Sequence, residues 1–518
     1  MNLSDILVHH AERFPERPAL EFEGRVSSWQ SLLEETQASA GALAEAGVGR
    51  GDVVAVLLHN SDRFLELMHA ISHLGAIFMP LNWRLVGPEI AYILDHAGAK
   101  VIVSEPELEE GVAPIQEQPA CRRLRIEGDS DPGWLSLDEL RAAARPRADA
   151  ADLAADDVHR LMYTSGTTAR PKGVMITYGN LYAKNVSHIV EFGMTAEDVG
   201  LACGPLYHVG ALDLTTTTLM YLGARTHVLR RFDATAALDA IERHRVSHIW
   251  LAPAMINAIL GEPGLDRRDL GSVRLIIDGG EKMPLPLIER VLGAFPNAWF
   301  ADAYGLTETV SGDTFLDKAR ARDKIGSVGT PVIHCEVRIV DPDDRPLPAG
   351  EAGEIVIRGP KVCKGYWRDE EATARAMRGG WFHTGDVGVL DEEGFLFIVD
   401  RLKDMILSGG ENVASLEVER ALYEHEAVVE AAVVGRRDRR WGEVPVAYVV
   451  LAQGRGDAKD ELRAHCAERL AKFKVPKEFH VVDSLPRNPT GKVLKRDLRE
   501  RQRVETEKED PAPETARA

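Results

Sequence analysis

Cysteine is scarce in this sequence, which has five in 518 residues. They lie far apart and form no C-x-x-C pair: Cys121, Cys203, Cys335, Cys363 and Cys466. We therefore expect neither a disulfide framework nor a structural zinc site, because both need paired or clustered cysteines. This cysteine usage fits a reducing compartment, and we expect a cytoplasmic protein.

Long apolar runs and an excess of positive charge are also missing. No run approaches the roughly 20 apolar residues that span a bilayer, and the N-terminus lacks the basic start and long apolar centre of a signal peptide. Lysine and arginine number 62 against 81 acidic residues, for a net charge of −19. This balance argues against a general nucleic-acid binder. A local positive pocket for a small anion stays compatible with it.

Apolar β-type runs alternate with helical patterns up to about residue 300. Strands are expected at 53–58, 76–80, 248–252 and 273–278, and helices at 62–74 and 285–295. Such alternation predicts α/β layers with largely parallel sheets. The length is too great for one core, so more than one domain is expected.

The pattern changes twice along the chain. From about residue 328 short strands and turns predict a β-rich subdomain, and after residue 400 a new α+β unit of about 100 residues begins. We predict a large N-terminal domain at 1–400 that includes the β-rich subdomain at about 328–400. A small C-terminal α+β domain at 401–503 and a disordered acidic tail at 504–518 would follow.

One polar loop is rich in donors for an anion. Residues 163–174 read Tyr-Thr-Ser-Gly-Thr-Thr-Ala-Arg-Pro-Lys-Gly-Val, with almost nothing apolar to bury. Backbone N–H groups freed by glycine and the hydroxyls can donate to phosphate oxygens, while Lys172 supplies charge. The sequence has no G-x-x-x-x-G-K-[ST] motif, so this is not a Walker A loop. A polar surface turn is the structural alternative.

The loop resembles the phosphate-binding signature of the acyl-adenylate-forming enzymes, which include acyl- and aryl-CoA synthetases. Further segments match that superfamily in its order: Pro205–His208, Tyr304–Thr309, Thr384–Asp386, Asp400–Asp404, Ser408–Asn412 and Pro489–Lys492. The resemblance covers nearly the whole chain. It implies an acyl-CoA synthetase that uses ATP, Mg²⁺ and CoA, with small-molecule partners and a homodimer as one expected assembly.

The resemblance also implies roles in catalysis. Lys492 would bridge the substrate carboxylate and the α-phosphate, where two anions must meet. Thr307 would donate to the α-phosphate, and Glu308 would be the Mg²⁺ ligand, since a hard cation prefers carboxylate oxygen. Without the resemblance, Lys492 reads as a solvated surface charge and Glu308 as a glutamate favoured by a helix N-terminus.

The nucleotide site implied by the resemblance spreads over several loops. Tyr304 would pack along the adenine, Asp302 would accept from its amino group, and Asp386 would take both ribose hydroxyls. The complete predicted ATP/AMP set is Thr164, Ser165, Gly166, Thr167, Thr168, Lys172, Gly280, Glu281, Asp302, Ala303, Tyr304, Gly305, Thr307, Asp386 and Arg401.

For the second half-reaction the resemblance implies that the small C-terminal domain is mobile. It would rotate about a hinge at Lys403 and exchange Lys492 for the segment that begins at Ser408. The predicted CoA site consists of Ser408, Gly409, Gly410, Trp441, Phe473, Lys474 and Lys477. Basic side chains beside aromatic ones suit a phosphorylated adenosine, although a merely solvated basic face fits the sequence equally well.

The predicted acyl pocket is apolar. His208 resembles a gate histidine, and the other members are Val209, Gly210, Ala211, Trp250 and Gly279. Small and apolar residues predict a roomy hydrophobic pocket for a fatty, aryl or polycyclic acid. Asp213 lies close in sequence to this loop, so an amino-acid substrate stays open as an alternative, with Asp213 pairing its α-ammonium group. Ala169, in place of a glycine, and Ala414-Ser-Leu416 depart from the family pattern.

Two rival functions remain open from the sequence. An adenylating ligase that loads a carrier-protein thiol would share the first half-reaction. A non-catalytic acyl-nucleotide-binding relative would share the fold alone, but retention of Lys492, Glu308 and Asp386 argues against it.

Overall fold

A computed structural model describes residues 2–117, 121–164, 170–279, 283, 285–408, 411–438, 440–452, 455, 458–487 and 493–509. The chain divides into two compact units. The first comprises Met1–Met283, Glu289–Val337 and Ile357–His383, and the second comprises Pro284–Ile288, Arg338–Val356 and Thr384–Ala518.

A seven-stranded, mainly parallel sheet forms one layer of the first unit. Its order is β7 (Leu135–Ser136), β6 (Arg122–Arg125), β5 (Ala99–Ser104), β3 (Val53–Leu57), β4 (Ile77–Pro80), β8 (Val158–Thr164) and β9 (Lys172–Thr177). Strands β3 and β4 are apolar throughout and fully buried, as expected for strands covered on both faces. Helices of this half are α1 (Asp5–Arg13), α2 (Trp29–Glu45), α3 (Asp62–His73), α4 (Gly87–Ala97) and α5 (Leu137–Ala143).

A nine-stranded sheet forms the other layer. Its order is β16 (Thr330–Pro331), β15 (Thr314–Phe315), β14 (Trp299–Tyr304), β13 (Leu275–Asp278), β12 (His248–Leu251), β10 (Val199–Ala202), β11 (Arg225–Val228), β1 (Pro18–Phe22) and β2 (Arg25–Ser28). The strands from β14 to β1 are parallel. The helices that follow them are α7 (Thr217–Leu222), α8 (Ala234–His244), α9 (Pro253–Leu260) and α10 (Leu285–Ala294), and α11 (Glu370–Ala376) comes later.

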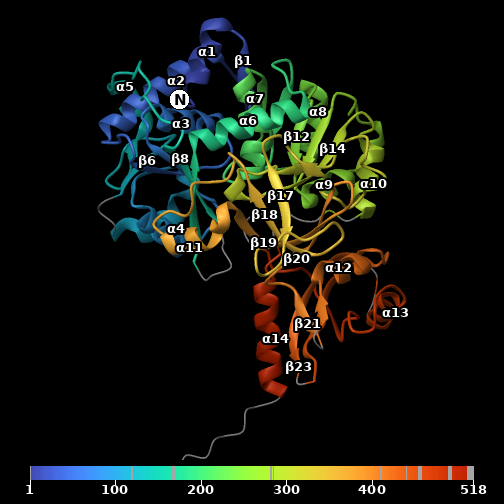
Figure 1. The fold of residues 1–518 in the computed structure, drawn as a ribbon. Helices are drawn as coiled ribbons and strands as arrows, with labels where there is room; N and C mark the ends of the chain where they lie inside the picture. Colours follow the sequence, from blue (N-terminus) through green and yellow to red (C-terminus); the bar gives the residue numbers. More distant parts are fainter. Residues whose placement is uncertain are drawn as a thin grey trace, which may run out of the picture. The chain divides into compact units, whose positions relative to one another are not determined.

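Helix α6 (Tyr178–Phe192) crosses the middle of this unit, between the part coloured blue to teal and the part coloured green (Figure 1). It begins with a capping box, in which Thr177 Oγ1 accepts from the Asn180 N–H and Asn180 Oδ1 accepts from the Thr177 N–H. It ends at Gly193, whose φ of 59° is left-handed. The local sequence thus fixes both ends of the helix.

The predicted site residues of this unit gather at strand ends. Thr164 closes β8, Tyr304 closes β14, and Gly279 follows β13 directly. The loop at 203–209 follows β10. Thr164 belongs to the seven-stranded sheet and the others to the nine-stranded sheet; because ligands of open α/β sheets bind beyond the carboxyl ends of parallel strands, these ends are where a site is expected.

The second unit contains two smaller sheets. One has the order β17 (Glu336–Val340), β18 (Gly353–Arg358), β19 (Phe382–Leu390) and β20 (Leu396–Arg401). The other has the order β22 (Glu411–Val413), β21 (Ile406–Ser408), β24 (Gly442–Leu451) and β23 (Val428–Asp438), with β25 (Glu478–Val481) parallel to β24. Its helices are α12 (Ser415–Tyr423), α13 (Lys459–Arg469) and α14 (Lys495–Glu509), and Figure 1 shows α14 beside β23. The predicted fold class, α/β layers followed by a small α+β unit, is confirmed.

Helix α14 corrects one expectation. It runs to Glu509 and so continues into the segment 504–518 for which the sequence predicted disorder. Low hydropathy suggested a tail, but residues 504–509 read Val-Glu-Thr-Glu-Lys-Glu, and Glu and Lys are strong helix formers. Within the part of the chain that the structure describes, no helix is both long and apolar enough to cross a membrane.

Candidate active site

A loop packed around Trp250 brings two predicted acyl-pocket residues, His208 and Gly210, against its indole. A Cβ atom added to Gly204 would lie 2.6 Å from the Trp250 ring, and one added to Gly210 would lie 2.8 Å from it. The His208 ring stacks on the same indole with centroids 6.2 Å apart. Glycine is therefore required at both positions, since any larger side chain would displace Trp250.

The tautomer of His208 follows from its neighbours. The Gly210 N–H donates to His208 Nδ1 over 3.1 Å. Nδ1 is thus an acceptor, and in the neutral ring the proton resides on Nε2. His208 is half-buried beside the buried Trp250, and its Nε2–H is oriented by the bond that Nδ1 accepts.

The other predicted pocket residues divide between two apolar clusters. Ala211 and Trp250 pack with Ile277 and Ala301, whereas Val209 packs with Met162, Val174, Leu181, Val310 and Cys363. Gly279 lies against the backbone of Ala303. A Cβ atom added to Gly279 would lie 3.3 Å from the carbonyl oxygen of Ala303.

The turn after β14 carries Thr307 and Glu308 in an unusual backbone. A short 3₁₀ turn at Thr307–Thr309 is followed by Val310, Ser311 and Gly312 with φ values of 56°, 61° and 63°. A left-handed β-branched valine is strained, and such strain persists only where the surroundings impose it. The buried Lys361 contacts this turn: its ammonium lies 2.9 Å from the Ser311 carbonyl oxygen and 3.0 Å from Asp313 Oδ1.

Glu308 is oriented by Tyr366. The Tyr366 hydroxyl donates to Glu308 Oε1 over 2.9 Å, and the Cys363 N–H donates to the Glu308 carbonyl over 2.7 Å. Lys172 Nζ lies 5.0 Å from the centroid of the Tyr366 ring. A half-buried carboxylate that a second side chain orients fits a hard cation such as Mg²⁺. The sequence analysis missed Tyr366 and Lys361, which lie in Lys361-Val-Cys-Lys-Gly-Tyr366, a stretch without a distinctive pattern.

The residues predicted to bind adenine lie at the end of β14. Asp302 and Tyr304 are buried, with exposed fractions of 5% and 9%. Gly305 packs directly against the backbone of Ser311 and Gly312, which leaves no room for a side chain. Ala303 pairs in register with Phe315 of β15. The predicted residues 302–305 thus form one continuous, rigid segment.

The predicted phosphate loop connects two antiparallel strands. Thr164 of β8 pairs in register with Lys172 of β9, so both ends of the loop are fixed. Several predicted site residues lie outside the described residues: Ser165, Gly166, Thr167, Thr168, Gly280, Glu281, Gly409, Gly410 and Lys492, together with Ala169.

In the second unit the two predicted ribose residues meet. Asp386 and Arg401 pair across β19 and β20, with Arg401 Nε 3.3 Å from Asp386 Oδ1. Asp386 is buried, and its N–H donates to Thr384 Oγ1 over 3.1 Å. Lys403 stands exposed in the turn that follows Arg401. Asp400 accepts from Ser415 Oγ over 2.7 Å, which ties this turn to α12.

The predicted CoA residues have mixed environments. Trp441 is exposed, and the Arg440 guanidinium lies 4.8 Å from its ring centroid. Ser408 pairs in register with Gly442, so Trp441 is adjacent to the end of β21. Lys474 Nζ lies 5.8 Å from the Phe473 ring but 2.7 Å from Glu417. That carboxylate already offsets its charge. The Lys477 N–H donates to the Pro445 carbonyl, which fixes its backbone beside β24.

Asp213 is not available to an amino-acid substrate. It is fully buried, and its carboxylate is bonded to Arg160 and to Thr217. A carboxylate occupied in this way has no place for an α-ammonium group, because a further cation would have to displace Arg160. This favours an acid without an α-amino group.

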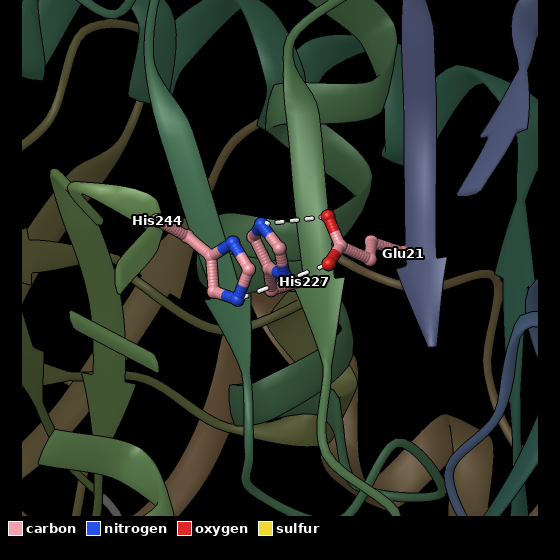
Figure 2. Close-up of side chains that lie close together, drawn as sticks. All are labelled: Glu21, His227 and His244. Atoms are coloured by element: carbon pink, nitrogen blue, oxygen red, sulfur yellow. Dashed lines mark ion pairs between the residues drawn. The ribbon is translucent and has the colours of Figure 1, made fainter. Parts of the chain in front are cut away.

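A group of metal-ligand type occurs away from this site, where β1, β11 and α8 meet. Figure 2 shows Glu21, His227 and His244 converging. However, one nitrogen of Arg225 lies 2.5 Å from His227 Nε2, 3.1 Å from His244 Nδ1 and 3.3 Å from Glu21 Oε2. Burial, with smaller contributions from His244 and Arg225, lowers the pKa of His227 to about 3, so the ring is a neutral acceptor. The protein's own guanidinium fills the position a metal would take.

Comparison with known proteins agrees with the motifs. The family model of the AMP-binding enzyme matches residues 7–367, and that of the AMP-binding enzyme C-terminal domain matches 417–492. The chain is 40% identical over 494 residues to a feruloyl-CoA synthase of an Amycolatopsis species, covering 95% of this chain and 98% of that protein. It is 38% identical to an indoleacetate–CoA ligase of Aromatoleum aromaticum, over 96% of this chain and 98% of that protein.

Solved structures agree as well. The o-succinylbenzoate CoA synthetase of Bacillus subtilis, in complex with its acyl-adenylate intermediate, superposes with a TM-score of 0.86 at 35% identity, covering 95% of this chain and 97% of that one. An anthranilate CoA ligase in complex with anthranoyl-AMP gives a TM-score of 0.92 at 27% identity, covering 98% of each chain. The chain belongs to the AMP-binding enzyme family, which confirms both the predicted resemblance to the acyl-adenylate-forming enzymes and the predicted class of AMP-forming acid–thiol ligase.

Proposed function

We propose that this enzyme activates an aromatic carboxylic acid with ATP and transfers the acyl group to CoA. The observation that carries the aromatic assignment is the loop stacked on Trp250, where two glycines and His208 surround one indole face and edge. Because this loop covers the buried Trp250, the indole holds one wall of the proposed pocket in a fixed shape, and a rigid apolar wall suits a flat aryl acid. The named relatives act on feruloyl, indoleacetate and succinylbenzoate groups, which supports the same class.

The proposed chemistry has two steps. In the first, a carboxylate oxygen attacks the α-phosphorus, a new P–O bond forms, and the bond to pyrophosphate breaks. In the second, the thiol sulfur of CoA attacks the acyl carbonyl and a C–S bond forms; the thiol proton passes to solvent, and AMP leaves as the C–O bond breaks. Both steps concentrate negative charge, so positioned donors and cations are the protein's main contribution.

The described residues suggest how that charge is handled. Glu308, oriented by Tyr366, would hold Mg²⁺, which neutralises phosphate oxygens when bound. Lys172 beside the Tyr366 ring would face the same phosphates. Thr307 would donate to the α-phosphate, and His208 would present its Nε2–H at the mouth of the acyl pocket. Lys492 stays the proposed bridge between carboxylate and phosphate.

We also propose roles for the remaining residues of the nucleotide site and for the domains. We assign the ribose to Asp386 and Arg401, the adenine to Asp302 and Tyr304, and the hinge to Lys403. The division into domains at 1–400 and 401–503, a homodimeric assembly and a cytoplasmic location are likewise proposed. Each rests on sequence patterns or on the resemblance to the family.

Pyrophosphate release across a panel of aryl, fatty and polycyclic acids, with and without CoA, tests the proposal. We expect release with aryl acids and a thioester product that mass spectrometry detects only when CoA is present. Release without any CoA thioester would instead support the carrier-protein alternative. If no acid gave pyrophosphate above the level of the Glu308→Gln variant, the proposed function would be wrong.

A further inference from the structure

A π-helix follows the acyl loop directly. It spans Gly210–Thr216, immediately after His208 and Val209. A π-turn shifts the regular ladder of helix hydrogen bonds, so some carbonyls need other donors, and such turns are frequent at functional sites. Side chains supply those donors here. Thr216 Oγ1 donates to the Ala211 carbonyl over 2.9 Å, and Thr218 Oγ1 donates to the Asp213 carbonyl over 3.1 Å.

Lys184 of α6 is the central donor. Its side chain is fully buried, and Nζ lies 2.7 Å from the Asp213 carbonyl oxygen, 2.8 Å from Thr217 Oγ1 and 3.0 Å from Thr218 Oγ1. Burial lowers the pKa of Lys184 to about 7, and the Asp213 carboxylate acts in the opposite direction. Lysine is almost never fully buried, because removing its charge from water is costly. A specific structural task is therefore the best account of its position.

Arg160 of β8 completes the cluster from the opposite side. Its Nη2 bonds to Asp213 Oδ2, while Thr217 Oγ1 donates to Asp213 Oδ1 over 3.1 Å. Arg160 and Asp213 are both fully buried. Buried ion pairs add little to net stability compared with apolar packing of the same volume, but they do define one arrangement of the elements they join. This one joins β8, α6 and the π-helix.

The cluster therefore controls where the acyl loop lies. Asp213 is three residues after Gly210, which packs against Trp250. If the π-turn relaxed to an α-turn, the residues before it would rotate relative to Trp250. We propose that Lys184, acting through Asp213 together with Arg160, is a positioning residue that sets the shape of the acyl pocket and hence the size of acid accepted. The inference rests on the proposed aryl-acid function of the Trp250 loop.

Two variants test it against a matched control. Lys184→Met removes the donors but leaves Arg160 and Asp213 paired, and Thr217→Val removes one hydroxyl with little change in volume. Ser187→Ala is the control, because this buried serine of α6 bonds to the Ala183 and Ile333 carbonyls and to no residue of the π-helix. Pyrophosphate release is measured for a compact and a bulky aryl acid, and kcat/KM is compared.

We expect both test variants to change the ratio of kcat/KM for the two acids by about tenfold, the discrimination that one or two methylene groups bring in an apolar pocket. The KM for ATP should stay within about twofold. An unchanged ratio in Thr217→Val, or an equal change in Ser187→Ala, would overturn the inference. Wild-type enzyme that releases no pyrophosphate with any acid would refute the proposed function itself, a result distinct from an active enzyme with unchanged selectivity.

Discussion

Replacing Tyr366 by phenylalanine tests the nucleotide half of the site with the smallest change that the structure allows. The variant removes one hydroxyl, which donates to Glu308 Oε1 over 2.9 Å, and keeps the ring beside Lys172. A hydrogen bond to a charged group contributes about 1.5–3 kcal/mol. Both residues are half-buried, so we take the lower end of that range. About 1.5 kcal/mol corresponds to roughly a tenfold change in an equilibrium constant.

The assay is pyrophosphate release at saturating acid while the Mg²⁺ concentration is varied. We expect Tyr366→Phe to need about tenfold more Mg²⁺ for half-maximal rate, because Glu308 is no longer oriented. Conversion of preformed acyl-AMP to the thioester should be unaffected, since it needs no metal-bound triphosphate. Tyr178→Phe is the control: it loses a buried hydroxyl contact with Ser72 Oγ at 3.0 Å, remote from Glu308 in sequence. A wild-type Mg²⁺ response in Tyr366→Phe would refute the reasoning.

Three further outcomes are expected. Gly210→Ala places a methyl group 2.8 Å from the Trp250 ring, which should destabilise the packing there by about 1–3 kcal/mol. We expect kcat/KM to fall more for aryl acids than for short acids. An equal loss for both would contradict the assignment of Trp250 to the wall of the acyl pocket. Lys361→Met leaves the buried Asp313 carboxylate without its cation. We expect the free energy of unfolding, measured by denaturant titration, to fall by about 3–5 kcal/mol. The double variant that adds Asp313→Asn should recover part of this loss. Lys492→Ala should abolish adenylation yet still convert preformed acyl-AMP with CoA, and adenylation at the wild-type rate would exclude the role given to Lys492.

The local sequence pattern predicted fully buried strands and amphipathic helices well. The strand expected at 53–58 is β3 and the helix expected at 62–74 is α3, since a run of buried β-branched residues and a 3.6-residue apolar period are local properties. The helix expected at 285–295 is α10, within one residue of its C-terminal end. Helix α14 was missed because hydropathy, not helix propensity, guided the expectation for the tail.

The supporting residues of the site could not be predicted in the same way. Lys184, Lys361 and Tyr366 act through partners between 29 and 58 positions away in sequence. In the sequence each looks like an ordinary surface residue, because a buried lysine and an exposed one share the same helical or loop context. Asp213 is the converse case: its sequence position suggested a ligand for an ammonium group, and only its contact with Arg160 excludes that role.

Helix α6 has a consequence for changing the enzyme's substrate range. The same buried face carries Lys184, which supports the acyl loop, and His188, whose Nε2 lies 3.4 Å from the carbonyl oxygen of Gly312 in the strained turn after Glu308. Asn180, one turn before Lys184, donates to the Pro360 and Val362 carbonyls on the segment leading to Tyr366. Substitutions that widen the acid pocket by moving this helix should therefore show epistasis with those that alter nucleotide affinity. Libraries that vary both regions together will sample combinations that stepwise selection rejects.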